Sequence, residues 1–92
     1  KGTMLTRPFV LDSGDVYVNA ESQNGELVAE VVDADTMEPL PGMSVSDFDK
    51  VKADVLRGRL TWNGKGAFAC ERPVRLRFEM DQAKLYAFWT EQ

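Results

Sequence analysis

The stretch PVRLRFEMD, residues 73–81, constrains the fold more than any other part of the chain, because apolar and charged residues alternate along it. Successive side chains of a β-strand point to opposite faces, so this pattern predicts a strand with one face on a core and one in water. Pro73 stands at its start, where a missing N–H is tolerated. The apolar phase is formed by Val74, Leu76, Phe78 and Met80.

Similar alternation predicts further strands at residues 16–20, 27–32 and 55–63, the last with Leu56, Leu60 and Trp62 in its apolar phase. An edge strand is expected at residues 6–11, because Pro8 cannot donate to a central ladder. Turn sequences such as SQNGE and MDQAK separate these runs. We therefore expect a single all-β domain over residues 1–92, a jelly-roll-like two-sheet antiparallel sandwich of about seven strands. Its predicted core includes Val31, Leu60, Trp62, Val74, Leu76, Phe78 and Phe88.

The acidic stretch LPGMSVSDFDKVKAD, residues 40–54, allows two interpretations. Its carboxylates Asp47, Asp49 and Asp54 could join backbone carbonyls around a calcium ion. Aspartates also favour loops because their side chains accept hydrogen bonds from nearby N–H groups, and we favour that role. A single helical turn with Ser46 as N-cap is compatible with the pattern, and Phe48 is expected to attach the segment to the core. No cofactor is predicted, and calcium is the minor alternative.

Composition excludes several classes of function. The net charge of −4 and pI near 4.7 disfavour nucleic-acid and anionic-membrane partners, which both reward a basic surface. The chain has no histidine and a single cysteine, Cys70, so a Ser-His or Cys-His nucleophile, an internal disulfide and a multi-thiolate metal site are all excluded. No catalytic residue is predicted, because sequence spacing in a β fold cannot establish that two carboxylates face each other across a cleft.

The last strand pattern, KLYAFWTE, carries apolar residues in both phases. If Tyr86 and Phe88 point inward, Leu85 and Trp89 form an exposed apolar patch. Such a patch indicates either contact with another domain, through Leu85 and Trp89, or a platform for sugar rings. The ligand-binding candidates for the second interpretation are Trp89, Tyr86 and Tyr17, since sugars stack on exposed aromatic faces.

Four arginines occupy the outward phases of two predicted strands. They form a basic stripe if those strands are neighbours, or they pair across strands with Glu30, Glu79 or Asp81. We favour the ion pairs. The four residues are Arg57, Arg59, Arg75 and Arg77.

Several phrases in order, LTRPFVL, VAEVVDADTMEPLPGMSVSDFD, LTWNGKG, RPVRLRFEM and AKLYAFW, resemble the C-terminal β-sandwich module of bacterial proteins with a five-bladed β-propeller related to glycoside hydrolase families 32 and 43. The resemblance spans residues 5–88. Departures are Thr36-Met37-Glu38 in place of a glycine-containing turn, Phe48 where the family commonly has cysteine, and Trp89 where a polar or basic residue is commoner.

The resemblance implies a non-catalytic accessory module that packs against an N-terminal catalytic domain, in an extracytoplasmic or secreted protein. It carries over no catalytic residue to this chain. The sequence, which opens directly on a strand pattern, looks like the C-terminal part of a larger chain. The alternative function is a carbohydrate-binding module that binds an oligosaccharide through its exposed aromatics, and a stand-alone hydrolase is disfavoured.

Overall fold

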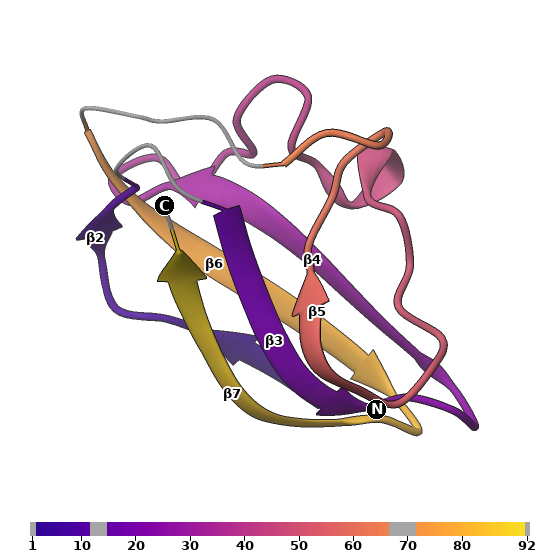
Figure 1. The fold of residues 1–92 in the computed structure, drawn as a ribbon. Coiled ribbons are helices and arrows are strands. Elements are labelled where there is room, and N and C mark those ends of the chain that lie inside the picture. The colour runs from indigo at the N-terminus through magenta and orange to yellow at the C-terminus, as the bar shows by residue number, and fades with distance from the viewer. Residues whose placement is uncertain (1, 12–14, 67–71, 92) are drawn as a thin grey trace.

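A computed structural model describes residues 2–11, 15–66 and 72–91 (Figure 1). Over these residues the chain forms seven strands and one 3-10 turn, and none of them lies in an α-helix. Within the same ranges there is no helix with the length and hydropathy to cross a membrane. The elements are β1 (Gly2–Leu5), β2 (Phe9–Val10), β3 (Asp15–Glu21), β4 (Glu26–Asp33), η1 (Val45–Asp47), β5 (Val55–Arg59), β6 (Pro73–Asp81) and β7 (Lys84–Glu91).

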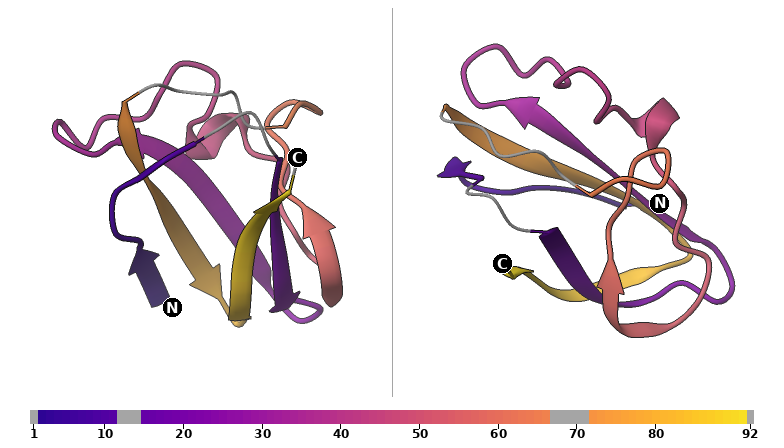
Figure 2. Two further views of the ribbon diagram at one scale, coloured as in Figure 1. Left: turned by 60° about the vertical axis from the view of Figure 1, so that its left-hand side comes forward. Right: turned by 45° about the horizontal axis from the view of Figure 1, so that its top comes forward.

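The strands form two antiparallel sheets, which confirms the predicted sandwich. In the first sheet, β4 runs along one edge of β6 over its whole length, while β1 and β2 pair with successive parts of the other edge. The second sheet has the order β5-β3-β7. Figure 2 (right) shows β4 and β6 in one layer and β3 and β7 in the other.

The core lies between the inner faces of the two sheets. Val16, Val18 and Ala20 of β3 face Val74, Leu76 and Phe78 of β6, and all six side chains are at most 1% exposed. Leu60 and Trp62, which follow β5, are buried as predicted, and Phe88 packs against Phe78 with ring centroids 5.7 Å apart. The other predicted core residues, Val31, Val74, Leu76 and Phe78, are buried as well, and Cys70 lies outside the described residues.

One long side of the sandwich is covered by residues 34–54, which run from the end of β4 to the start of β5 (Figures 1 and 2). We call this side of the sandwich the closed side. Backbone bonds attach this segment to the edge of β4: Leu27 N donates to Val51 O at 2.9 Å, and Val31 N to Met43 O at 3.1 Å. Phe48 packs edge-on against Trp62, whose Nε1 donates to Ala29 O at 3.1 Å inside the core. The segment thus contributes both side chains and hydrogen bonds to the fold.

The 3-10 turn in this segment begins one residue after Ser44, so Ser44 is the N-cap residue and the prediction of Ser46 was wrong. The Ser44 hydroxyl bonds the Asp47 carboxylate at 2.9 Å instead of a backbone N–H of the turn. Phe48 follows the turn and is 6% exposed, which confirms its expected attachment to the core.

The opposite long side, the open side, lies between the β1-β2 edge of the first sheet and the β7 edge of the second. A groove of about 520 Å³ occurs there, and its lining is almost entirely apolar. Neither edge has a further strand paired with it in the part of the chain that the structure describes. The lining residues are Met4, Leu5, Thr6, Arg7, Pro8, Phe9 and Phe88.

Candidate functional site on the second sheet

The pairing of β3 with each of its two neighbours, β5 and β7, is irregular near Asn19. On β7, Ala87 pairs with Asn19 and Leu85 with Ala20, so Tyr86 is an extra residue between them. On β5, Gly58 pairs with Val18 and Val55 with Ala20, so two residues of β5 stand opposite Asn19 alone. An extra residue in one strand changes which face the following side chains occupy. The outer face of the second sheet therefore differs from the one that simple alternation predicts.

The β5 bulge places Leu56 in solvent. This side chain is 82% exposed, and its assignment to the apolar phase with Leu60 and Trp62 was wrong. The inward position belongs to Val55, which packs against the core opposite Ala20. Gly58 keeps its inward place, and a Cβ there would come within 2.8 Å of Val55 Cγ2, so the bulge needs a residue without a side chain.

The β7 bulge explains the apolar residues in both phases of KLYAFWTE. Leu85 and Phe88 both pack against the core, although an odd number of positions separates them. Tyr86 is 55% exposed, so the condition that Tyr86 and Phe88 both point inward is not met. Trp89 lies on the outer face opposite Tyr17. Leu85 and Trp89 thus lie on opposite faces of β7 and do not form one patch.

The three predicted ligand-binding aromatics share the outer face of the second sheet. Tyr17 and Trp89 are paired across β3 and β7, with ring centroids 6.2 Å apart and planes 20° from parallel. The guanidinium of Arg57 lies 4.4 Å from the Tyr17 centroid, over the ring. Tyr86 projects from the β7 bulge, which is nearer to the end of β3 in the same sheet. The structure therefore brings Tyr17, Tyr86 and Trp89 to one surface.

Glu91 holds the side chains of Arg57 and Trp89 in place on this surface. Its carboxylate accepts two bonds from Arg57, at 2.7 and 3.0 Å, and a third from Trp89 Nε1 at 2.8 Å. The bonds from Arg57, then from Trp89, hold the pKa of Glu91 below its ordinary value, and the same pairing raises the pKa of Arg57. Because Arg57 covers one face of Tyr17, a sugar could stack on that face only if Arg57 moved.

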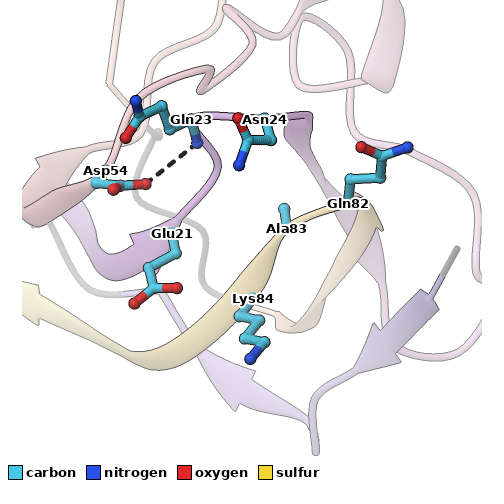
Figure 3. Close-up of a pocket in the computed structure, with 7 residues that line it drawn as sticks. All are labelled: Glu21, Gln23, Asn24, Asp54, Gln82, Ala83 and Lys84. Carbon is cyan, nitrogen blue, oxygen red and sulfur yellow. Dashed lines mark hydrogen bonds between the residues drawn. The ribbon is translucent and has the colours of Figure 1, made fainter.

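Two adjoining hollows lie beside the two bulges on this face and at the neighbouring end of the sandwich. The first, about 350 Å³, lies between the two bulges and is walled by Leu56 and Tyr86. The second, about 340 Å³, lies between the β3-β4 and β6-β7 connections (Figure 3). Glu21 and Asp54 line both hollows, so the two adjoin at these side chains and make one depressed region. We call it the bulge cleft, and its other lining residues are Asn19, Ala20, Gln23, Asn24, Val55, Gln82, Ala83 and Lys84.

Hydrogen bonds hold the groups of the bulge cleft in place. Asp54 Oδ1 accepts from the backbone N–H groups of Ser22 and Gln23 at 3.0 and 3.1 Å, the latter drawn in Figure 3. The Ser22 hydroxyl is buried and donates to Ala53 O at 2.7 Å. The neighbouring Glu21 carboxylate is the main reason that the pKa of Tyr86 is raised above 10.0. The tyrosine is thus neutral at neutral pH.

The three aspartates considered for calcium accept hydrogen bonds at two places, Asp47 and Asp49 from residues 61–64 and Asp54 from residues 22–23. Asp47 accepts from Asn63, Asp49 from the Thr61 hydroxyl and Gly64 N–H, and Asp54 from Ser22 and Gln23. The Thr61 bond and then the Gly64 bond lower the pKa of Asp49. Among the described residues no three acidic or thiol groups are close enough to hold a metal ion. Their arrangement is that of loop-forming aspartates.

The four arginines are divided between the sheets, because β5 and β6 are not neighbours. A basic stripe is therefore not formed. Arg77 pairs with the buried Glu30 across β6 and β4 at 2.6 Å, which confirms one predicted ion pair. Arg75 donates to Thr6 O instead, and Arg59 pairs with Asp15. The Nε atoms of Arg75 and Arg77 are buried and lack a hydrogen-bond partner among the residues the structure describes.

Sequence reasoning missed the polar half of the bulge cleft, which includes Glu21, Gln23 and Asn24. The turn sequences SQNGE and MDQAK were visible, but their proximity follows from topology. Glu21 pairs with Lys84 and Glu26 with Asp81, so both connections leave the same end of the sandwich. A Cβ at Gly25 would clash with the carbonyl oxygen of Asp81, so glycine is needed where the two turns meet.

Comparisons of this chain with known family models, with curated proteins and with solved structures find no match.

Proposed function

We propose that this chain is a non-catalytic accessory module that packs through its open side against another domain of a larger carbohydrate-active protein. The observation that carries the proposal is the apolar groove of about 520 Å³ between the β1-β2 edge and β7. Exposed apolar area of this kind marks a surface that is covered by a partner. The resemblance to propeller-associated sandwich modules supports a neighbouring catalytic domain as that partner.

Three features of the groove fit a domain contact better than a small ligand. Leu5, one of its lining residues, is 42% exposed, so apolar area reaches the surface at the groove. Its lining offers few polar groups to orient a small ligand, whereas specific ligand sites place several. Unpaired edge strands at both rims can also bond a partner's backbone.

The test adds the neighbouring domain encoded by the parent gene to the isotope-labelled 92-residue chain. We expect chemical-shift changes or line broadening at Met4, Leu5, Phe9 and Phe88. Leu5→Asp should weaken the complex about tenfold or more, because it places an unpaired charge in an apolar contact. Met37→Asp is the matched control, since Met37 is equally apolar and 42% exposed but lies outside the groove.

Absence of a further domain in the parent gene would overturn the proposal, and so would shift changes confined to the outer face of either sheet. Equal effects of the Leu5 and Met37 variants would also contradict it.

A second candidate function, carbohydrate binding, is favoured by one specific observation. Tyr17, Tyr86 and Trp89 share the outer face of the second sheet, which the open-side contact leaves uncovered. Aromatic faces next to hydrogen-bonding side chains are the usual components of sugar sites. Titration of the chain with oligosaccharides at millimolar concentration tests this function. If no resonance of the outer face shifts with any of them, the function is excluded.

A further inference from the structure

The second candidate function can be narrowed to one place and one class of ligand. We propose that the bulge cleft, and not the Trp89-Tyr17 pair above it, binds an oligosaccharide, and that this oligosaccharide is neutral. The inference rests on the carbohydrate-binding function proposed above and adds its site and its selectivity.

Shape is the first argument. The two parts of the bulge cleft, about 350 and 340 Å³, adjoin at Glu21 and Asp54. Each lies within the volume range of small-ligand sites, and together they make an elongated depression. An elongated depression on a sheet face suits a chain of linked sugar rings better than a compact ligand. By contrast, one face of Tyr17 is already covered by Arg57, whose guanidinium is 4.4 Å from the ring centroid.

The distribution of apolar and polar groups is the second argument. Leu56 and Tyr86 are 82% and 55% exposed and stand at one end of the cleft, where they offer apolar surface to the C–H face of a sugar ring. Carboxylates and amides line the rest. Sugar hydroxyls both donate and accept, so they can satisfy the carboxylates of Glu21 and Asp54 and the amide of Asn24 together.

Preorganisation is the third argument. Asp54 is fixed by two backbone N–H donors, and Tyr86 and Glu21 line the same hollow. Gly25 approaches the backbone of Asp81 closely, which holds the β3-β4 and β6-β7 connections together. Gln23, Asn24, Gln82 and Ala83 of these connections line the cleft in Figure 3. Groups that are held before binding lose less conformational entropy when the ligand arrives. The bulges that form the cleft are backbone features, so the site does not depend on side-chain rearrangement.

Charge decides the class of sugar. Two carboxylates, Glu21 and Asp54, lie where the two hollows meet, and Lys84 is the one cation that lines the cleft among the described residues. A uronate would place a third negative charge beside them, which is unfavourable. Neutral hydroxyls meet no such penalty. We therefore infer selection for neutral over anionic oligosaccharides of equal length.

The experiment titrates the isotope-labelled chain with cellotetraose, xylotetraose and an inulin-type tetrasaccharide as neutral probes, and with tetragalacturonate as the anionic probe. We expect at least one neutral probe to shift the amide resonances of Glu21, Gln23 and Tyr86 with a millimolar Kd, and the anionic probe to bind at least tenfold more weakly. Tyr86→Ala should weaken binding about tenfold. Met37→Ala, at an exposed position outside the cleft, should leave it unchanged.

The outcomes distinguish a failure of carbohydrate binding from a failure of the proposed binding site. If no probe shifts any resonance, carbohydrate binding itself fails and the bulge cleft with it. If a neutral probe shifts Tyr17 and Trp89 but not Glu21, Gln23 and Tyr86, the chain binds sugar and the bulge cleft is the wrong site. Tighter binding of tetragalacturonate, or of a chitosan tetramer carrying positive charge, overturns the selectivity for neutral sugars. Tyr86→Phe keeps the ring, and a loss equal to that of Tyr86→Ala would contradict the stacking role.

Discussion

The two long sides of this sandwich differ in how their sheet edges are covered. On the closed side, residues 34–54 bond the edge of β4 and insert Met43 and Phe48 into the core. On the open side, the edges of β1, β2 and β7 flank an apolar groove, and Met4 and Phe88 are only partly buried. Within the described ranges, the same core thus has one side covered by its own chain and one side whose edge strands have no further strand beside them. The difference indicates which side contributes most to folding and which is available to a partner.

The largest expected effect comes from the closed side. Trp62→Ala removes a side chain that is 2% exposed, packs on Phe48 and donates to Ala29 O. We expect a loss of about 3–5 kcal/mol in the free energy of unfolding. Phe88→Ala, on the open side, should cost about 1–2 kcal/mol, because the ring is already partly exposed. Urea denaturation followed by circular dichroism measures both.

A loss of 3–5 kcal/mol could leave a domain of this size unfolded, so a milder variant accompanies it. Trp62→Phe keeps an aromatic ring and removes the N–H donor, which leaves Ala29 O without this bond. We expect about 1–2 kcal/mol for that change. Equal losses for the Phe88 and Trp62 alanine variants would show that both sides contribute alike, which would contradict the comparison.

Amide hydrogen exchange should show the same difference without any mutation. The amides of Leu27, Val31 and Val51 donate across the closed side, at 2.9 to 3.1 Å. Those of β7 that point away from β3 have no further strand beside them in the described ranges. We expect protection on the order of 100-fold greater for the first group. Similar protection of the two groups would mean that something already covers the open side of the isolated chain.

Alternation in the sequence predicted the sandwich and most of its core, because a strand with one buried face must repeat every two residues. The strand at 73–81 is observed with those bounds. The prediction failed at Leu56 and Tyr86, where a bulge adds a residue to one strand but not to its partner. A bulge is a property of two strands together, so a single strand's pattern does not reveal it. KLYAFWTE did carry a signal, since apolar residues in both phases are what a change of phase produces.

The candidate site was predicted only in part for the same reason. Exposed aromatics can be recognised one residue at a time, and Tyr17, Tyr86 and Trp89 do lie on one face. The polar wall of the bulge cleft comes from two turns that are almost 60 residues apart and meet only because β3 pairs with β7 and β4 with β6. Their proximity is a consequence of topology. Sequence alone favoured a loop-forming role for Asp54 over a cation site, and its carboxylate does fix the first of these turns.

The smallest predicted effect concerns the pH dependence of the closed side. Asp49 accepts from the Thr61 hydroxyl at 2.6 Å and from Gly64 N–H at 2.7 Å, and these bonds lower its pKa below the ordinary 3.8. A carboxyl group with a lower pKa in the folded state stabilises the fold above its unfolded pKa. That contribution is lost as the pH falls through about 4 towards the folded pKa.

Asp49→Asn should therefore lower the urea midpoint at pH 7, and the difference from the natural chain should shrink as the pH is lowered to 3. Asp35→Asn makes the same chemical change at an exposed turn position and should shift the midpoint less at pH 7. The variants are compared by urea unfolding at pH 7, 5 and 3. A midpoint difference for Asp49→Asn that stays constant over this range would mean that the ionised carboxylate is not what attaches residues 61–64 to the closed side. The stability of that side would then come from its backbone bonds and from Phe48 and Trp62, and the contrast with the open side would rest on packing alone.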